Sequence, residues 1–364
     1  MNKFISRLLV AALPLSFAAC SDDDGPDHEI ETVTVSNGAF IVNSGNLRNN
    51  IPGSLTFIDY ATGQASQDVF KAANGRVLGD TPQNAVVYGS KMYIAVYQSN
   101  LIEVVDRVSL KSLKTIPFDA SEGQEPRFVL AHEGKVYASM YNGYVQRIDT
   151  LSLSIDGAVK VGPNPEEMCV AGDYLYVANS DGMNYQNGYA DGCTVSKIAL
   201  GSFTEEKKIN VGINPTKMAS DGNNVYVITM GDYSAANPAT LRQIVNDNTV
   251  NAIAPATLMG AGAGKLYFIN APYGASSIDY KVLDTATGTI SAFPVSGVDS
   301  PAAIAVDPVV GDVFVTSYNM VGGYASYSTP GYVEQYKADG SLVKHYDTGV
   351  GPCYVNFNIA EVAK

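Results

Sequence analysis

Tryptophan is absent from this chain of 364 residues, and histidine and cysteine are scarce, with three and four residues. The missing indole disfavours the tryptophan-stacked cofactor of quinoprotein enzymes. So few histidines argue against a histidine-based metal site or a catalytic triad. Lysine and arginine together number 23 against 36 acidic residues, which leaves a net charge of −13. This balance argues against nucleic acid as a partner, because contacts to phosphates need clustered basic side chains.

A hydrophobic run long enough to span a bilayer is also lacking. The apolar stretch Leu8–Phe17 follows Lys3 and Arg7 and ends at Ala18-Ala19, a pattern typical of a signal peptide. We therefore predict that residues 1–19 are a signal peptide, and we exclude them from the fold.

The residues that follow resemble a lipoprotein signal. Phe17-Ala18-Ala19-Cys20 resembles a bacterial lipobox, which predicts acylation of Cys20. Ser21–Gly25 resembles the acidic export tag of Bacteroidota lipoproteins, which implies the extracellular face of the outer membrane; the alternative is a merely flexible acidic tether. Residues 20–34 are interpreted as the acylated cysteine and this tether, with the lipid as the only anchor.

The remaining cysteines are Cys169, Cys193 and Cys353, an odd number for an oxidising compartment. At most one disulfide can form within the chain, so this is not a disulfide scaffold. Cys169 and Cys193 can pair only if the intervening loop folds back, and buried free thiols are the alternative.

What the sequence does contain is a sevenfold repeat of a short aromatic strand that follows a turn, as in Gly172–Asn179. The seven aromatic positions are spaced 39 to 53 residues apart: Phe40, Tyr93, Tyr137, Tyr176, Tyr226, Tyr267 and Phe314. This spacing is typical of a four-stranded propeller blade. Because the five tyrosines of this set recur with the repeat, we predict that they are core residues.

Each copy has similar neighbours. A strand led by proline precedes most copies, at Pro82, Pro126, Pro165, Pro215 and Pro301; the blade near Ala256–Gly260 is the least regular. Proline suits the entry to an innermost strand, where no ladder donor is needed. An alternating third strand follows each copy, at 54–60, 101–107, 144–150, 194–200, 240–246, 278–284 and 332–338.

The two ends of the chain complete the count. The chain enters the repeat with a second strand near Phe40 and finishes with a first strand, Pro352–Phe357. Both ends must therefore share one blade, which removes the open sheet edges. We predict an all-β fold over residues 35–364, a seven-bladed β-propeller of four-stranded antiparallel blades, with no helix of convincing length.

Function is expected on the face where loops enter the first strands and join the second to the third, because these loops are the longest. They are rich in tyrosine, asparagine and glycine, a composition typical of adaptable recognition surfaces. The alternative is that these tyrosines pack between blades. The predicted ligand-binding residues are Asn46, Arg48, Tyr97, Gln98, Tyr141, Asn142, Tyr185, Tyr189, Asp232, Tyr233, Tyr273, Tyr318, Asn319 and Tyr324.

Enzymatic alternatives have weaker support. A sialidase needs an arginine cluster, and Arg48, Arg127 and Arg242 are scattered along the chain. A propeller lactonase holds an axial metal, for which Glu166, Asn179 and Asn214 are conceivable ligands without a specific motif. We therefore predict a binding protein that is not an enzyme, with no catalytic residue, metal site or cofactor.

A resemblance adds to these inferences. Asn164-Pro165 together with Gly172–Asn179 resembles the YncE-like propellers, over essentially the whole mature chain. With the lipobox and acidic tag, the chain resembles BtuG-type surface lipoproteins of Bacteroidota. The resemblance implies capture of cobalamin or another corrinoid and its transfer to a TonB-dependent transporter of the BtuB type. The alternatives are capture of haem or an iron siderophore, and a scaffold for protein–protein assembly. No binding residue can be assigned by motif.

Overall fold

The structure is a computed structural model that describes residues 31–118, 122–275 and 277–363. The predicted signal peptide, the predicted lipidation site Cys20 and most of the tether lie outside the described residues. No helix in the described part of the chain has the length and apolar character needed to cross a membrane.

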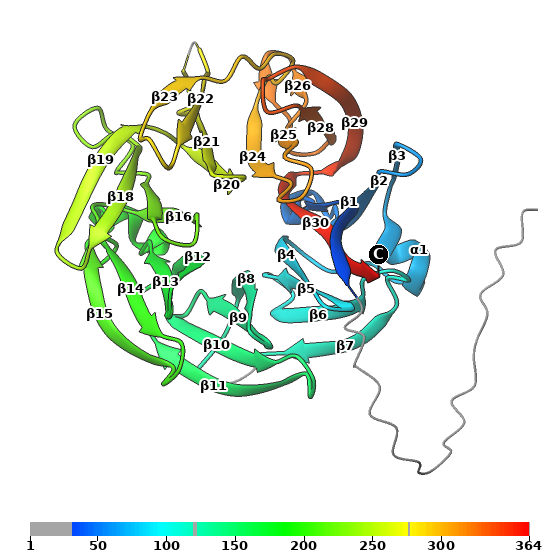
Figure 1. Cartoon of the computed structure of the whole chain (residues 1–364), viewed down its shortest axis with the longest axis horizontal. Coiled ribbons are helices and arrows are strands. Elements are labelled where there is room, and N and C mark those ends of the chain that lie inside the picture. The colour runs from blue at the N-terminus through cyan, green and yellow to red at the C-terminus, as the bar shows by residue number, and fades with distance from the viewer. Residues whose placement is uncertain (1–30, 119–121, 276, 364) are drawn as a thin grey trace, which may run out of the picture.

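The described strands form a closed ring of seven four-stranded antiparallel sheets, as predicted (Figure 1). The first strand of each blade faces the central axis, and the fourth lies at the rim. We number the blades along the chain and give their strands from the axis outwards.

Blade 1 comprises β30 (Pro352–Ala363), β1 (Thr32–Asn43), β2 (Ser54–Asp59) and β3 (Gln64–Ser66). Blade 2 comprises β4 (Pro82–Tyr88), β5 (Lys91–Val96), β6 (Leu101–Asp106) and β7 (Ser112–Pro117). Blade 3 comprises β8 (Pro126–His132), β9 (Lys135–Met140), β10 (Tyr144–Asp149) and β11 (Ser154–Lys160). Blade 4 comprises β12 (Pro165–Ala171), β13 (Tyr174–Asn179), β14 (Thr194–Ala199) and β15 (Thr204–Asn210).

The other three blades repeat the pattern. Blade 5 comprises β16 (Pro215–Ser220), β17 (Val225–Thr229), β18 (Thr240–Asn246) and β19 (Thr249–Pro255). Blade 6 comprises β20 (Leu258–Gly262), β21 (Lys265–Asn270), β22 (Asp279–Asp284) and β23 (Ile290–Ala292). Blade 7 comprises β24 (Pro301–Val306), β25 (Val313–Ser317), β28 (Pro330–Tyr336) and β29 (Leu342–Val350).

Loops carry the remaining elements. The long loop of blade 7 contains a two-stranded hairpin of β26 (Met320–Val321) and β27 (Tyr324–Ala325). The 3-10 helices η1 (Leu47–Asn49) and η2 (Gly182–Asn187) lie in the corresponding loops of blades 1 and 4. The six-residue helix α1 (Val69–Asn74), which joins blades 1 and 2, is not indicated by the sequence pattern. It forms because burial of Phe70 anchors a segment too short to show helical periodicity.

Blade 1 joins the two ends of the chain, as predicted. β1 pairs with β30 in antiparallel register, for example Phe40 with Asn356, and the pairing continues past a bulge at Ser36 to Thr32 and Ala363. Next to the bulge, the hydroxyls of Ser36 and Tyr60 donate to the buried carboxylate of Asp307 in blade 7, at 2.6 and 3.0 Å. These bonds fasten the closing blade to its neighbour.

The core lies between adjacent blades. Tyr93, Tyr226 and Tyr267 are at most 2% exposed, which confirms the prediction that they belong to the core, and Phe40 and Phe314 are buried to the same extent. Tyr137 is also buried, whereas Tyr176 is only partly buried against the cluster between blades 4 and 5.

The face on which second strands end and first and third strands begin carries the long loops, and we call it the loop face. β1 runs towards this face and β30 runs away from it, because β1 leads into the loop at Ser44 and β30 begins at Pro352. Both ends of the described chain therefore leave from the opposite face.

Aspartates start the hairpins on that opposite face. Asp106, Asp149 and Asp284 end third strands, and their carboxylates accept backbone N–H bonds from residues two or three positions later. These bonds hold the pKa of each carboxyl below its ordinary value, the first cause in each case being the N–H of the third residue. The turns thus prefer the charged form.

The lowered pKa values set the sign of a pH effect. The contribution of the charged carboxylates is complete above the unfolded pKa of about 3.9 and is lost as the pH falls towards the lower folded values. We expect a variant with Asp106→Asn, Asp149→Asn and Asp284→Asn to be less stable than the parent at pH 7. The difference should shrink on acidification below about pH 4. Urea unfolding at neutral and acid pH measures it, and a difference that stays constant with pH would contradict the assignment.

Candidate functional site

The residue after each strand-opening proline lies at the entrance of the axial channel on the loop face. In six blades the pairing of first and second strands contains a register shift at this point. Such a bulge bends a strand and redirects a side chain. A cavity of about 380 Å³, which we call the channel mouth, is lined by these six residues: Gln83, Arg127, Glu166, Thr216, Ala302 and Cys353.

The sequence pattern indicates the proline-led strands but does not indicate that the residues after these prolines form a ring. Arg127 entered only as one of three scattered arginines, and Glu166 only as a conceivable metal ligand. A sequence signal for the ring exists, because the strand-opening proline and the position after it recur in every blade except blade 6.

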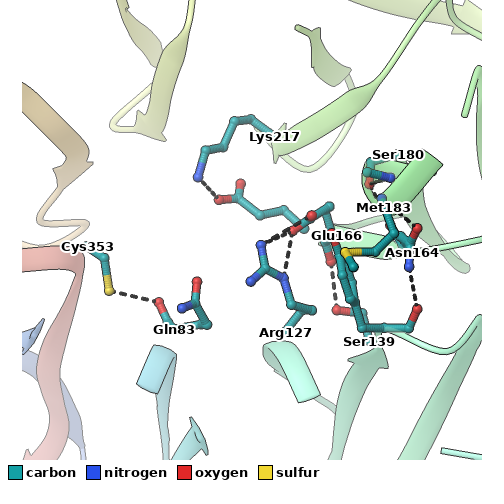
Figure 2. A network of polar contacts seen from close by, with 12 residues as sticks. Gln83, Arg127, Ser139, Asn164, Glu166, Ser180, Met183, Lys217 and Cys353 are labelled. Atoms are coloured by element: carbon teal, nitrogen blue, oxygen red, sulfur yellow. Dashed lines mark hydrogen bonds and ion pairs between the residues drawn. The ribbon is translucent and has the colours of Figure 1, made fainter. Parts of the chain in front are cut away.

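Arg127 is held in an aromatic clamp. Its guanidinium lies 4.9 and 4.8 Å from the ring centroids of Tyr97 and Tyr141, and these two rings are perpendicular, 5.6 Å apart. Arg127 donates to both oxygens of Glu166 through Nε and Nη2, at 2.8 to 3.2 Å (Figure 2). Burial of the guanidinium is the largest single influence and opposes its charge, but the Glu166 carboxylate together with Tyr141 and Tyr97 holds the pKa of Arg127 above its ordinary value.

A second ion pair lies deeper in the mouth. Lys217 Nζ donates to Glu167 Oε1 at 2.7 Å, and Glu167 Oε2 accepts the N–H of Met218. Burial opposes the charge of Lys217, but the Glu167 carboxylate outweighs it and raises the pKa of the amine. All four charged side chains that line the mouth are thus paired, and the mouth has no net charge.

The channel continues into a mainly apolar cavity of about 470 Å³, which shares Phe128, Lys217 and Tyr354 with the mouth. Cys353 lies between the two cavities, and its thiol donates weakly to backbone carbonyls, including that of Gln83 (Figure 2). Burial raises the pKa of this thiol to about 12, so it is protonated at neutral pH. Cys169 and Cys193 are also free thiols, so the disulfide alternative is not adopted; Cys169 is buried and Cys193 is partly exposed.

A further cavity of about 500 Å³, which we call the tyrosine pocket, lies between the loops of blades 6 and 7. Tyr273, Tyr318, Tyr324 and Tyr327 line it, and three of them were among the predicted site residues. Tyr273, Tyr324 and Tyr327 are 99%, 79% and 57% exposed. Burial raises the pKa of Tyr318, whose ring lies 4.8 Å from that of Tyr327.

The tyrosine pocket adjoins the channel mouth. Ala271 and Pro301 line both cavities, so one concave surface runs from the axis outwards over blades 6 and 7. Tyr233 extends this surface to blade 5, because it lines the mouth while 68% of it remains exposed.

The other predicted tyrosines and Asp232 have mixed positions. Tyr185 on η2 is 60% exposed, whereas Tyr189 is buried and its ring lies 6.5 Å from that of Tyr233. Asp232 accepts bonds from Ser234 N–H and from the Asn237 amide, which shape the loop that carries Tyr233.

The predicted asparagines have partners within the loops. Asn46 donates to the carbonyl of Tyr327 at 2.8 Å, and Asn319 donates to that of Pro330 at 2.8 Å. Asn142 accepts the N–H of Gln124 at 3.0 Å. Arg48 and Gln98 are exposed on the loop face.

The conceivable metal ligands have other partners. Glu166 binds Arg127, Asn179 donates to Thr194 and Ser196 in its own blade, and Asn214 donates to the carbonyl of Gly231. The described residues include no cluster of three or more His, Cys, Asp or Glu side chains suited to a metal ion.

Comparison with known proteins gives the family and supports the fold. A family model described as "Domain of unknown function (DUF5074)" matches residues 37–356. No curated protein matches the chain. A provisionally named 6-phosphogluconolactonase from Bacteroides uniformis superposes with a TM-score of 0.62 at 13% identity, over 88% of this chain and 99% of that one.

Two other solved structures are similar. Hydrazine synthase from Kuenenia stuttgartiensis has a TM-score of 0.58 at 15% identity, over 78% of this chain and 95% of that chain. The computationally designed protein Ika8 has a TM-score of 0.50 at 10% identity, over 74% and 88%. At these identities the likeness concerns the propeller fold alone.

Proposed function

This chain belongs to the DUF5074 family, and we propose that it is a surface lipoprotein whose propeller captures cobalamin or another corrinoid on the loop face. One observation carries the proposal. Exposed tyrosines surround a concave surface, and the four charged side chains at its centre, in the channel mouth, are all paired. Rigid aromatic rings bind large ligands at low entropic cost, and loops on a rigid scaffold are the usual place for recognition.

The chemistry of a corrinoid suits this surface. A corrinoid is large, amide-rich and nearly neutral, so it needs aromatic surface and polar partners without a cluster of free cations. An anionic siderophore or haem would require unpaired basic side chains, whereas Arg127 and Lys217 at the mouth are engaged by Glu166 and Glu167. The proposed identity of the ligand rests on the resemblance of the sequence to BtuG-type lipoproteins.

The proposal includes the location and the partner. The lipobox at Cys20 and the acidic residues after it support a lipid anchor at the extracellular face of the outer membrane. The captured corrinoid would then pass to a TonB-dependent transporter of the BtuB type. We propose no catalytic role.

Calorimetry tests the capture directly. The chain from Glu31 onward contains every strand of the closed ring and is the form to titrate. With cyanocobalamin we expect saturable binding with one site per chain, while haem and a ferric siderophore bind at least about tenfold more weakly, a difference of about 1.4 kcal/mol. Absence of cyanocobalamin binding at micromolar concentrations would reject the corrinoid, and hydrolysis of a lactone would favour an enzyme.

A further inference from the structure

Three tyrosines on the loop face occupy equivalent positions in the repeat. Tyr97, Tyr141 and Tyr318 each follow the second-strand residue that pairs with the strand-opening proline. The N–H of each donates to the carbonyl of the residue before that proline, at 3.0 to 3.1 Å. Blades 2, 3 and 7 therefore present a tyrosine ring in the same backbone setting.

In blades 2 and 3 this setting is occupied by a cation. Arg127 lies against Tyr97 and Tyr141, and the carboxylate of Glu166 neutralises it. The molecule thus contains one complete example of two tyrosine rings and a carboxylate around an organic cation.

Blade 7 has the rings and a carboxylate but a different side chain at the position of the arginine. Tyr318 is paired with Tyr327, with ring planes at 61°. The residues equivalent to Arg127 are Ala302 in blade 7 and Cys353 in blade 1, which line the channel mouth and not the tyrosine pocket, so neither supplies a cation to Tyr318. Asp299 is exposed and is the one charged residue among the described residues that line the tyrosine pocket.

We propose that the tyrosine pocket binds an organic cation, in which a guanidinium or alkylated ammonium group lies against Tyr318 and Tyr327 and is neutralised by Asp299. Tyrosine faces attract such cations through the negative face of the ring, and an adjacent carboxylate adds a counter-ion. The net charge of −13 favours the approach of cations. The pocket volume of about 500 Å³ leaves room for further atoms of the ligand beyond the cationic group.

This site goes beyond corrinoid capture and does not depend on it. The channel mouth presents only paired charges, whereas the tyrosine pocket presents an aromatic surface with a carboxylate. The two cavities adjoin at Ala271 and Pro301, so a corrinoid and a cation would share part of this surface, but the cation site needs only the residues of the tyrosine pocket.

Titration with simple cations tests the proposal. The probes are choline and methylguanidine, which separate the two cation types, and 3,3-dimethylbutan-1-ol, which has the shape of choline without its charge. NMR of the probe methyl groups reports ring contact as an upfield shift. We expect at least one cation to bind about tenfold or more tightly than the uncharged alcohol. The proposal is overturned if neither cation binds, or if neither cation binds more tightly than the uncharged alcohol.

Variants locate the site. Tyr327→Leu should weaken cation binding about tenfold, whereas Tyr327→Phe retains the ring face and should retain binding. Asp299→Asn should also weaken binding of the cation and leave the affinity for the uncharged alcohol unchanged. The control is Tyr185→Leu, which removes an equally exposed tyrosine of blade 4 outside the pocket. Cation binding that is indifferent to Tyr327→Leu and Asp299→Asn would contradict the assignment.

Failure of this proposal and failure of corrinoid capture have different signatures. Cyanocobalamin titrated into Asp299→Asn should bind as in the parent, because a nearly neutral ligand gains little from this carboxylate. If Asp299→Asn loses cation binding but keeps corrinoid binding, Asp299 is specific to the cation. If the parent protein binds cations but does not bind cyanocobalamin, the cation site stands and only corrinoid capture is rejected.

Discussion

Glu166→Ala should lower the free energy of unfolding by about 2–4 kcal/mol, because it leaves the guanidinium of Arg127 enclosed by Tyr97 and Tyr141 without a counter-ion. The side chains of Arg127 and Glu166 are 22% and 15% exposed, so water replaces little of the lost pair. The remaining exposure still lets water solvate part of the guanidinium, so the expected loss lies below the cost of breaking a fully buried pair. Urea unfolding of the parent and the variant measures it.

A double variant separates the charge from the packing. Arg127→Met with Glu166→Ala removes both charges, and replacement of a buried pair by apolar groups is often close to neutral. We expect the double variant to be more stable than Glu166→Ala alone. Lys217→Met, which breaks the neighbouring pair with Glu167, provides a matched comparison. A Glu166→Ala variant within about 0.5 kcal/mol of the parent would mean that the pair contributes little, as exposed pairs do.

Corrinoid binding should fall by about 100-fold or more when Tyr233 and Tyr273 are both replaced by alanine. Each ring is more than two-thirds exposed, one lines the channel mouth and the other the adjoining pocket. Truncation of a central tyrosine in an interface costs on the order of 2 kcal/mol, and two such losses together exceed a factor of 100. Calorimetry with cyanocobalamin gives the dissociation constants of the parent and of the alanine double variant.

The same positions supply the control for this prediction. Phenylalanine at Tyr233 and Tyr273 keeps the ring faces, so binding should stay within a few-fold of the parent if stacking dominates. The exposed side chains contribute little to the core, so thermal unfolding should be unchanged in both variants. Unaltered affinity of the alanine double variant would place the ligand away from these tyrosines.

The architecture could be predicted from the sequence because it is repeated. An aromatic second strand at Tyr93 or Tyr226 and a proline-led first strand at Pro82 or Pro215 recur at blade spacing, and local patterns of this kind specify the strands without long-range information. The shared blade followed from the order of strands at the two ends. Helix α1 was not predicted, because a single buried side chain, Phe70, fixes it and leaves no helical periodicity in the sequence.

The channel mouth could not be assembled in the same way. Its side chains differ from blade to blade, and they meet only because the ring closes; Arg127 and Glu166 are 39 positions apart in the chain. Composition correctly selected Tyr97 and Tyr141 as residues of the loop face, but it gave no means of knowing that Arg127 fills the space between their rings. Tyr318, in the equivalent position of blade 7, lines the tyrosine pocket instead.

The departure of both chain ends from the face opposite the loops has a mechanical consequence. A pull between the N-terminal end and a molecule held on the loop face acts along β1, parallel to the strand and across its hydrogen bonds with β30 and β2. Antiparallel ladders loaded in this direction are sheared, so their bonds share the load and do not open one after another. A pull that separates the two chain ends from each other instead peels β1 from β30, beginning with the pair Thr32 and Ala363. The ring should therefore resist traction along its axis far better than traction between its own ends.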